Sequence, residues 1–133
     1  MSEEIYRQKI LDHYRHPRNF GTLKKATHAA GHQNISCGDA VQFQVRIVKG
    51  RVADIAFTGE GCAVSIAAAS MLSEFAKNKA LKTILKMDKP AIEKIIGISV
   101  SGAREQCAML GLETLKQLQK KKTPPSLEVT PNR

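Results

Sequence analysis

The sequence contains no tryptophan, and only 5% of its 133 residues are aromatic. A platform of aromatic side chains for stacking bases is therefore not expected. No apolar run approaches the roughly 20 residues that a membrane-spanning helix needs. The charged start, MSEEIYRQK, also lacks the apolar centre of a secretory signal. We therefore expect a cytoplasmic protein that binds neither nucleic acid nor membranes.

Acidic residues are also scarce, because 12 Asp and Glu stand against 21 Lys and Arg, giving a formal net charge of +9. The basic residues are scattered along the chain, apart from one run at Lys120-Lys121-Lys122. A solvated basic surface is the simplest interpretation of such scatter. Docking onto an acidic protein partner is also compatible with it.

A hydrophobic content of 42% and a charged content of 25% are typical of a globular domain. The length suits one domain with a core of its own. We expect this domain to span residues 1–122. The prolines and polar residues that follow predict a flexible tail over residues 123–133.

Apolar and polar residues alternate on both sides of Lys49-Gly50, which predicts a β-hairpin. A weaker strand signal covers residues 27–33, and the stretch TGEG at 58–61 is expected to end the last strand. The side chains expected to face the core are those of Val41, Phe43, Val45, Ile47, Ala53, Ile55 and Phe57.

Helices are predicted on both sides of the hairpin. The first has Tyr6, Ile10 and Tyr14 on one face and ends before Pro17. Further helices are expected over residues 63–80, 81–86, 89–97 and 101–122. The fold class is therefore α+β: a small antiparallel sheet of about three strands covered by helices.

Only three cysteines occur, and no two of them form a Cys-x-x-Cys pair. An odd number in a reducing compartment argues against structural disulfides, and the missing pair argues against a ready-made zinc knuckle. Cys37 precedes the predicted hairpin, Cys62 follows it, and Cys107 lies in the last helix. Each is either a small buried apolar residue or a functional thiol.

The hairpin can return Cys37 and Cys62 to one edge of the sheet, and Asp39 stands two residues after Cys37 in the stretch SCGD. If Cys107 joins them, three thiolates and one carboxylate suit tetrahedral zinc or the terminal positions of a [2Fe–2S] cluster. A carboxylate is a harder ligand than a thiolate. Asp39 would then be a labile ligand, as a carrier of cargo requires. Scattered, unrelated cysteines are the alternative.

Four blocks follow one another along the chain: DHYRHPRNFG (12–21), SCGDAVQF (36–43), FTGEGCAVSIAAAS (57–70) and REQCAML (104–110). Together they resemble the IscU/NifU N-terminal family of iron–sulfur cluster assembly scaffolds, over about residues 6–118. The resemblance implies a compact IscU/SufU-like α+β fold with three strands. It also implies that the four candidate ligands meet at one exposed end: Cys37, Asp39, Cys62 and Cys107.

The resemblance implies a function as well. Family members accept sulfur from a cysteine desulfurase, bind iron, assemble a [2Fe–2S] cluster and transfer it to apo-proteins, and many hold zinc at the same ligands. By position, Cys107 is expected to be the main persulfide acceptor and Cys37 a second candidate. We therefore expect a scaffold or carrier more than an enzyme.

Two departures from the IscU pattern point to an alternative. Gln106 stands where many IscU proteins have a histidine. The run VSGAR (100–104) replaces the Leu-Pro-Pro-Val-Lys stretch that an Hsp70-type chaperone grips, so docking of that kind is not expected. Arg104, three residues before Cys107, is similar to the SufU branch, whose members use zinc to accept persulfide sulfur. The alternative is thus a SufU-like zinc-dependent sulfurtransferase, although the spacing from Cys62 to Cys107 leaves no room for the insertion usual in SufU proteins.

Other residues near the predicted site have narrower roles. Arg104 places a positive charge one turn from Cys107, which would favour the thiolate there. His28 or His32 could reach the site from the segment before Cys37, whereas His13 and His16 are expected to pack or to lie at the surface. A zinc-stabilised interaction module without sulfur chemistry is a third interpretation.

Overall fold

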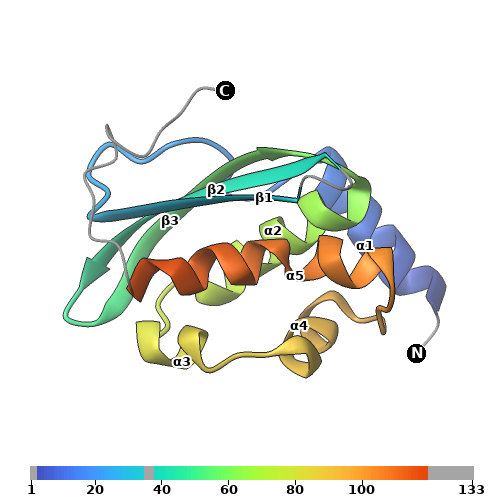
Figure 1. Ribbon diagram of the computed structural model, residues 1–133. Helices are drawn as coiled ribbons and strands as arrows, with labels where there is room; N and C mark the ends of the chain where they lie inside the picture. Colours follow the sequence, from blue (N-terminus) through green and yellow to red (C-terminus); the bar gives the residue numbers. More distant parts are fainter. Residues whose placement is uncertain (1–2, 35–37, 120–133) are drawn as a thin grey trace.

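The computed structural model describes residues 3–34 and 38–119, which form a three-stranded antiparallel sheet with helices packed on one face (Figure 1). The strand order is β1-β2-β3, with β1 at His28–Asn34, β2 at Asp39–Val48 and β3 at Arg51–Glu60. The predicted α+β class is confirmed. The helices are α1 (Glu3–Arg15), α2 (Ala63–Ala76), α3 (Leu81–Leu85), α4 (Lys89–Ile96) and α5 (Ala103–Lys116), followed by the 3₁₀ turn η1 (Gln117–Gln119).

The β2–β3 hairpin has two arms of equal length joined by the two-residue turn Lys49-Gly50. Both turn residues have positive φ, +52° and +78°. This is the type I′ geometry, whose twist matches that of the strands it joins. Because the arms match, the residues just before β2 and just after β3 return to the same end of the sheet.

The hairpin departs from the predicted alternation at one position. Ala53 was expected to face the core, but Val52 does so instead, at 1% exposure. The register shifts between Arg46 and Ile47, so that Arg46 pairs with Asp54 and Ile47 with Val52. This is a β-bulge with Ala53 as the extra residue. On the turn side of the bulge, the side chains that face the core and those that face away exchange places.

Strand β3 also runs further than predicted. The stretch TGEG does not end it after Phe57, because Thr58, Gly59 and Glu60 continue the pairing with β2. Gly59 fits there for lack of a side chain: a Cβ would lie 2.5 Å from the carbonyl oxygen of Ala40. The strand therefore carries the chain to the level of β2's first residues.

The core lies between the sheet and the helices. Both α2 and α5 pack against the sheet and against each other, while α1 and α4 pack against α2. Small residues on α2 allow this close approach, as predicted. Gly111 of α5 lies where a Cβ would be 3.5 Å from both Leu72 and Phe43. The largest fully buried side chains include Phe43, Phe57, Ile55, Leu72, Ile84, Ile92, Ile96, Leu112 and Leu115.

The outer edge of β3 is covered by other segments. The backbone of Phe57 bonds with Asn19 and Gly21, and that of Val52 bonds with Asn78 and Lys79. Covered edges do not offer a template for pairing with another chain. Within the described residues, no helix is both long and apolar enough to cross a membrane. The predicted tail (123–133) lies outside the described residues.

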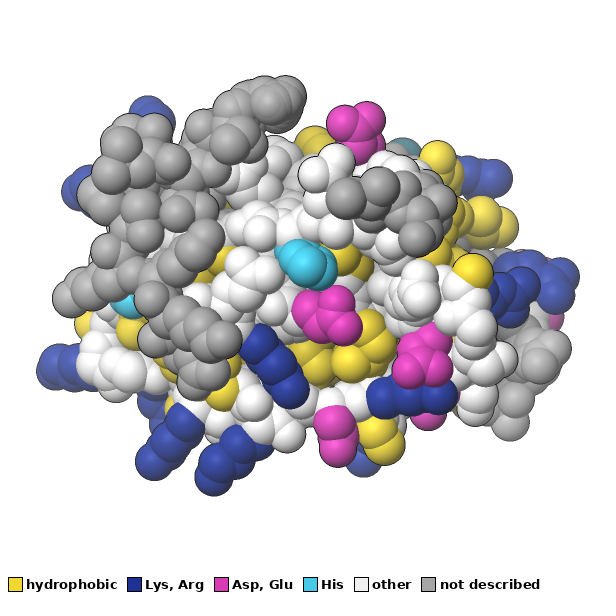
Figure 2. Space-filling model, in the orientation of Figure 1, with side chains coloured by type: hydrophobic (Ala, Val, Ile, Leu, Met, Phe, Trp, Pro, Cys, Tyr) yellow, Lys and Arg dark blue, Asp and Glu magenta, His cyan; other side chains and the backbone are white. Residues whose placement is uncertain are grey.

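Charge is unevenly distributed on the surface. Figure 2 shows Lys and Arg side chains gathered at the lower left, over the end of the molecule that holds the hairpin turn and α3. The Asp and Glu side chains visible in this view lie farther to the right.

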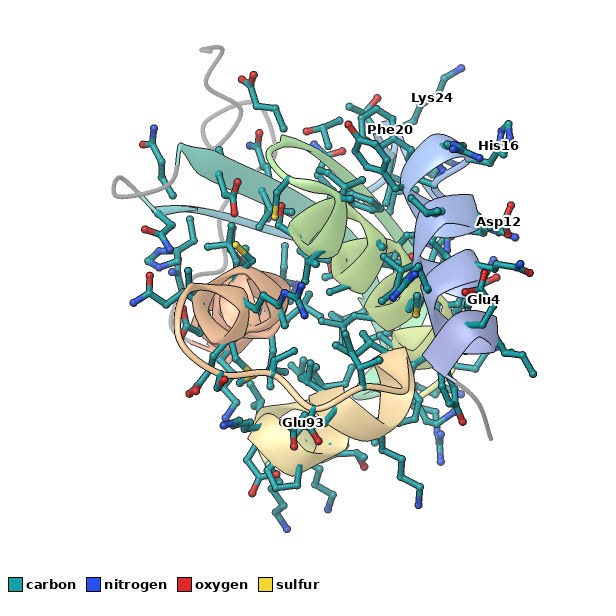
Figure 3. All side chains as sticks on the ribbon, turned by 90° about the vertical axis from the view of Figure 1, so that its right-hand side faces the viewer. Glu4, Asp12, His16, Phe20, Lys24 and Glu93 are labelled. Atoms are coloured by element: carbon teal, nitrogen blue, oxygen red, sulfur yellow. The ribbon has the colours of Figure 1, made fainter. Side chains whose placement is uncertain are left out.

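Helix α1 ends at Arg15, two residues before Pro17, as the proline predicts. Its buried face is formed by Tyr6, Ile10 and His13 rather than by Tyr14, which is 43% exposed. Figure 3 shows Glu4, Asp12 and His16 on the outer side of the helix. The buried side of α1 includes His13 because α1 packs on α2, which provides a polar partner for this side chain.

That partner is Ser70 of α2, whose hydroxyl lies 2.7 Å from Nδ1 of His13 and also accepts a hydrogen bond from the backbone N–H of Arg18. His13 is 4% exposed. Burial, followed by the positive charge of Arg18, lowers the pKa of His13 below its ordinary value. The histidine therefore acts as a neutral packing residue, as predicted.

The lowered pKa of His13 predicts acid sensitivity. Because the unfolded chain binds a proton at an ordinary pKa near 6.5 and the folded chain resists it, stability is complete above that pH and falls below it. We expect the free energy of unfolding to fall as the pH is lowered from 7 to 5. Urea unfolding of His13→Gln should show a flatter profile over this range. Arg15→Gln, an exposed substitution on the same helix that removes no histidine, is the control; equal slopes in wild type and His13→Gln would contradict the prediction.

Candidate metal and sulfur site

Asp39 and Cys62 meet because of the hairpin register. Ala40 pairs with Glu60, so Asp39 at the start of β2 stands beside the two residues that follow β3. The second of these is Cys62, which is the N-cap residue of α2, as predicted. Its backbone N–H donates a hydrogen bond of 3.1 Å to Oδ1 of Asp39. The Sγ of Cys62 lies 4.0 Å from Oδ2 of the same carboxylate.

The Asp39 carboxylate also serves α2 electrostatically. The helix has no acidic residue in its own first turn and no side-chain hydrogen bond from its N-cap. A carboxylate at a helix N-terminus interacts favourably with the helix dipole and with its free N–H groups. Asp39 supplies that charge from β2 and is itself 1% exposed. It is therefore part of the fold as well as a candidate ligand.

Cys107 reaches the same place from α5. It lies just over one turn into the helix and is 7% exposed. The ligand atoms of Asp39, Cys62 and Cys107 all lie within 4.8 Å of one another. Cys62 is exposed and Cys107 is buried, and both are free thiols. The site is thus a shallow centre with one open side at Cys62 and a buried wall formed by the other two residues.

Gly61 leaves the space that this arrangement needs. A Cβ at this position would overlap Oδ1 of Asp39 and would lie 2.6 Å from Oγ of Ser65. The backbone there has a φ of +155°, at the limit of the region that side chains rarely adopt. Only glycine allows the chain to pass so close to the carboxylate.

The surroundings of Cys107 favour its protonated form. Burial, then hydrogen bonds with Asp39 and Cys62, raise the pKa of the Cys107 thiol well above its ordinary range. A hydrogen bond from the thiol to a carboxylate stabilises the neutral sulfur. A bound divalent cation reverses this balance, because a coordinating thiol is deprotonated. The donor set of two thiols and one carboxylate fits a thiophilic ion such as zinc.

The other predicted residues have different outcomes. Cys37 lies outside the described residues, so its part in the site stays a prediction. Arg104 is exposed in the first turn of α5, and its predicted support of the Cys107 thiolate also stays a prediction. His28 pairs with Val45, far along β2 from Asp39, and His32 contacts Glu113 and Gln117.

Ser65 is a neighbour of the site that sequence reasoning missed. Its Oγ lies 3.8 Å from Sγ of Cys62 and donates a hydrogen bond of 3.0 Å to the backbone carbonyl oxygen of Cys62. Serine often bonds to the backbone three or four residues earlier, so its place three residues after Cys62 was a local signal for this contact. Ser65 stabilises the turn that carries the thiol.

Gln106 was also missed as a contact. Its Oε1 accepts a hydrogen bond of 3.1 Å from Nδ2 of Asn34, which pairs with Asp39 across the sheet. The bond joins the strand pair that carries Asp39 to the helix that carries Cys107. The two residues are 72 positions apart, so no local pattern could have indicated the contact.

This bond predicts a modest effect on metal binding. An exposed neutral hydrogen bond contributes about 0.5–1 kcal/mol, so Gln106→Ala should weaken zinc binding roughly two- to fivefold. Gln117→Ala is a matched control, because Gln117 contacts β1 through His32 at the far end of α5. Competition with a chromogenic chelator measures both affinities. Equal affinity in Gln106→Ala and wild type would show that the bond does not position the site.

A family model described as "NifU-like N terminal domain" matches residues 5–122. The chain belongs to this family. The predicted family, fold and iron–sulfur assembly class are thereby confirmed. Proteins similar to this chain include iron–sulfur cluster assembly scaffold proteins and a zinc-dependent sulfurtransferase.

Three similar proteins illustrate the range of the family. The zinc-dependent sulfurtransferase SufU of Bacillus subtilis (strain 168) is 33% identical, over 86% of this chain and 89% of its own. The iron–sulfur cluster assembly scaffold protein IscU of Aquifex aeolicus is 35% identical, over 83% and 71%. A crystal structure described as a putative SUF-system scaffold from Fervidobacterium islandicum superposes with a TM-score of 0.72 at 22% identity, covering 89% of this chain and 98% of that one. At 22% identity, the likeness to this last structure shows a shared fold only.

Proposed function

We propose that this protein accepts sulfur from a cysteine desulfurase, binds iron, and assembles a [2Fe–2S] cluster that it passes to apo-proteins. The observation that supports this most directly is the convergence of Asp39, Cys62 and Cys107 within 4.8 Å, with Cys62 exposed. Cys37 is proposed as a further ligand. An exposed thiol next to two buried ligands suits cargo that must enter and leave.

Cys107 is the proposed sulfur acceptor. Its thiol first loses a proton, and Asp39, its hydrogen-bond partner, lies where it can take that proton. The sulfur of Cys107 then attacks the terminal sulfur of the desulfurase persulfide. A new S–S bond forms on Cys107 while the donor's S–S bond breaks, and the desulfurase cysteine leaves as a thiolate. Cys62 and Asp39 then stand beside the persulfide as ligands for iron.

One observation favours a second candidate, a SufU-like zinc-dependent sulfurtransferase. A single tetrahedral ion with bonds of about 2.0–2.3 Å holds its ligand atoms roughly 3.3–3.8 Å apart. The three ligand atoms, all within 4.8 Å of one another, are closer to that spacing than to ligands divided between two irons. Zinc would keep the thiols deprotonated, and Asp39, Cys62 and Cys107 would hold it, with Cys37 as the fourth candidate.

Anaerobic reconstitution with iron, cysteine and a cysteine desulfurase tests the leading proposal. The scaffold should develop visible cluster absorption, and Cys62→Ala should abolish it. Ser99→Ala is the control, because Ser99 is an exposed residue outside the site. No absorption in the wild type, or unchanged absorption in Cys62→Ala, would end the scaffold proposal.

The same preparation separates the two candidates. Stoichiometric, tightly held zinc that is required for faster alanine release by the desulfurase, without cluster absorption, would favour the sulfurtransferase. Zinc that iron and sulfide readily displace would favour the scaffold. Treatment with a persulfide-charged desulfurase followed by mass spectrometry should place the sulfane sulfur on Cys107 in either case.

A further inference from the structure

Eight basic side chains form a basic end of the molecule, opposite the metal site. They come from the segment after α1, from the hairpin turn and the adjoining ends of β2 and β3, and from the region between the end of α2 and α3. Lys24 projects away from the body of the molecule in Figure 3. The basic end comprises Lys24, Lys25, Arg46, Lys49, Arg51, Lys77, Lys79 and Lys82.

Backbone contacts make these segments one surface. The N–H of Leu81 donates to the carbonyl oxygen of Gly50, and that of Val52 donates to Lys79. The guanidinium of Arg51 donates to the carbonyl oxygen of Asn78. The hairpin turn and the segment before α3 are therefore held side by side. Their exposed cations, gathered at the lower left in Figure 2, share one field.

A small pocket adds a concave feature to this end. It has a volume of about 230 Å³ and is lined by Leu23, Lys24, Lys25, Arg46 and Asp54. The side chain of Gln44 fixes the pocket wall, because its Oε1 accepts a hydrogen bond of 2.8 Å from the N–H of Leu23. Asp54 lies 3.8 Å from Nζ of Lys77, so its carboxylate offsets one of the eight charges. The pocket lining thus has three basic side chains and one carboxylate, and its net charge is positive.

We infer that the basic end is a docking surface for an acidic segment of a partner protein, with one carboxylate side chain entering the pocket. Nucleic acid fits this surface less well. Phe75, the aromatic residue beside Lys79, has its ring covered by Nζ of that lysine at 4.7 Å from the ring centre, so it offers no free face to a base. A membrane fits less well too: among the described residues of the hairpin turn and of α3, only Val48 is a large exposed apolar residue, and insertion needs several.

The basic end lies far from the metal site. Arg46 is seven residues along β2 from Asp39, which places it about 23 Å from the metal site at roughly 3.3 Å per residue. A partner bound there leaves Cys62 uncovered. The basic end would hold an acidic partner while the site remains open to a second protein. This inference does not depend on which metal or cluster the site carries.

Fluorescence anisotropy with a labelled 12-residue polyglutamate peptide tests the inference on the full chain. The test variant is Lys24→Gln/Lys25→Gln/Lys49→Gln, and the control Lys9→Gln/Arg15→Gln/Lys94→Gln removes the same charge from exposed positions elsewhere. We expect the test variant to bind at least about fivefold more weakly and the control to change less than about twofold. Wild-type binding should weaken as salt is raised.

Parallel measurements with a 12-nucleotide single-stranded DNA and with phosphatidylserine vesicles complete the test. Tighter binding to polyglutamate than to either probe supports the inference. Tighter binding to DNA or to vesicles overturns it, as does equal weakening in the two triple variants, which would mean that only net charge matters. Undetectable polyglutamate binding also overturns it. Circular dichroism spectra of the variants should match that of the wild type.

Discussion

Gly61→Ala is expected to weaken zinc binding at least about tenfold and to lower the free energy of unfolding by about 1–3 kcal/mol. The added methyl group would overlap the carboxylate of Asp39 and press on Oγ of Ser65. Asp39 would have to move, and it would then lose both its place beside Cys62 and its hydrogen bond to the N-terminus of α2. Chelator competition and urea unfolding measure the two effects.

Gly50→Ala is the matched control for that substitution. Gly50 has a φ of +78° in the hairpin turn, and a Cβ there would meet nothing within 4 Å. It should cost about 1 kcal/mol of stability through backbone strain and leave zinc affinity unchanged. If Gly61→Ala bound zinc as tightly as Gly50→Ala, Asp39 would not be a ligand in the place where the structure puts it.

Cys107→Ser is expected to have the largest effect on the site. Four-ligand zinc centres are worth roughly 10–16 kcal/mol in binding free energy, so losing one thiolate should weaken zinc binding by about 100-fold or more. The same variant should carry much less sulfane sulfur than the wild type after exposure to a charged desulfurase. Serine is nearly isosteric with cysteine, so the fold should persist beside Asp39 and Cys62.

Cys62→Ser separates the two roles of sulfur. It removes a ligand and should also weaken zinc binding strongly, yet it should still accept sulfane sulfur on Cys107. Persulfide mapping by mass spectrometry distinguishes the variants. Sulfane sulfur on Cys107→Ser at wild-type levels would mean that another cysteine is the acceptor.

Much of the sheet could be predicted because its causes are local. The alternation around Lys49-Gly50 and the preference of that turn for positive φ define the hairpin. The exchange of Ala53 for Val52 in the core could not be predicted, because a bulge depends on how β2 and β3 pair and not on either strand alone. The choice of His13 over Tyr14 likewise depends on Ser70, which lies 57 residues away.

The candidate site likewise combines features that the sequence indicates with features that depend on tertiary packing. Residue types and chain positions marked Cys37, Asp39, Cys62 and Cys107 as candidates, and the resemblance implied that they meet; the structure brings Asp39, Cys62 and Cys107 together, while Cys37 lies outside the described residues. The burial of Asp39 and Cys107 was not predictable, because it depends on how β2, α2 and α5 pack; Asp39, for example, accepts a hydrogen bond from the start of α2. The bond from Asn34 to Gln106 is equally a product of tertiary packing.

The two ends of the molecule suggest a division of labour. The thiols and the carboxylate lie where β2 begins and β3 ends, whereas the basic end surrounds the hairpin turn. Strands of ten residues keep these regions roughly 30 Å apart. A partner held at one end therefore need not compete with chemistry at the other.

X-ray absorption at the zinc K-edge tests most directly whether the two thiols and the carboxylate bind one metal ion. The zinc-loaded protein should show sulfur at about 2.3 Å and a shorter oxygen contribution at about 2.0–2.2 Å, and Cys107→Ser should lose one sulfur. A shell of only nitrogen and oxygen in the wild type, or a sulfur count unchanged by the substitution, would contradict a shared metal site at Asp39, Cys62 and Cys107.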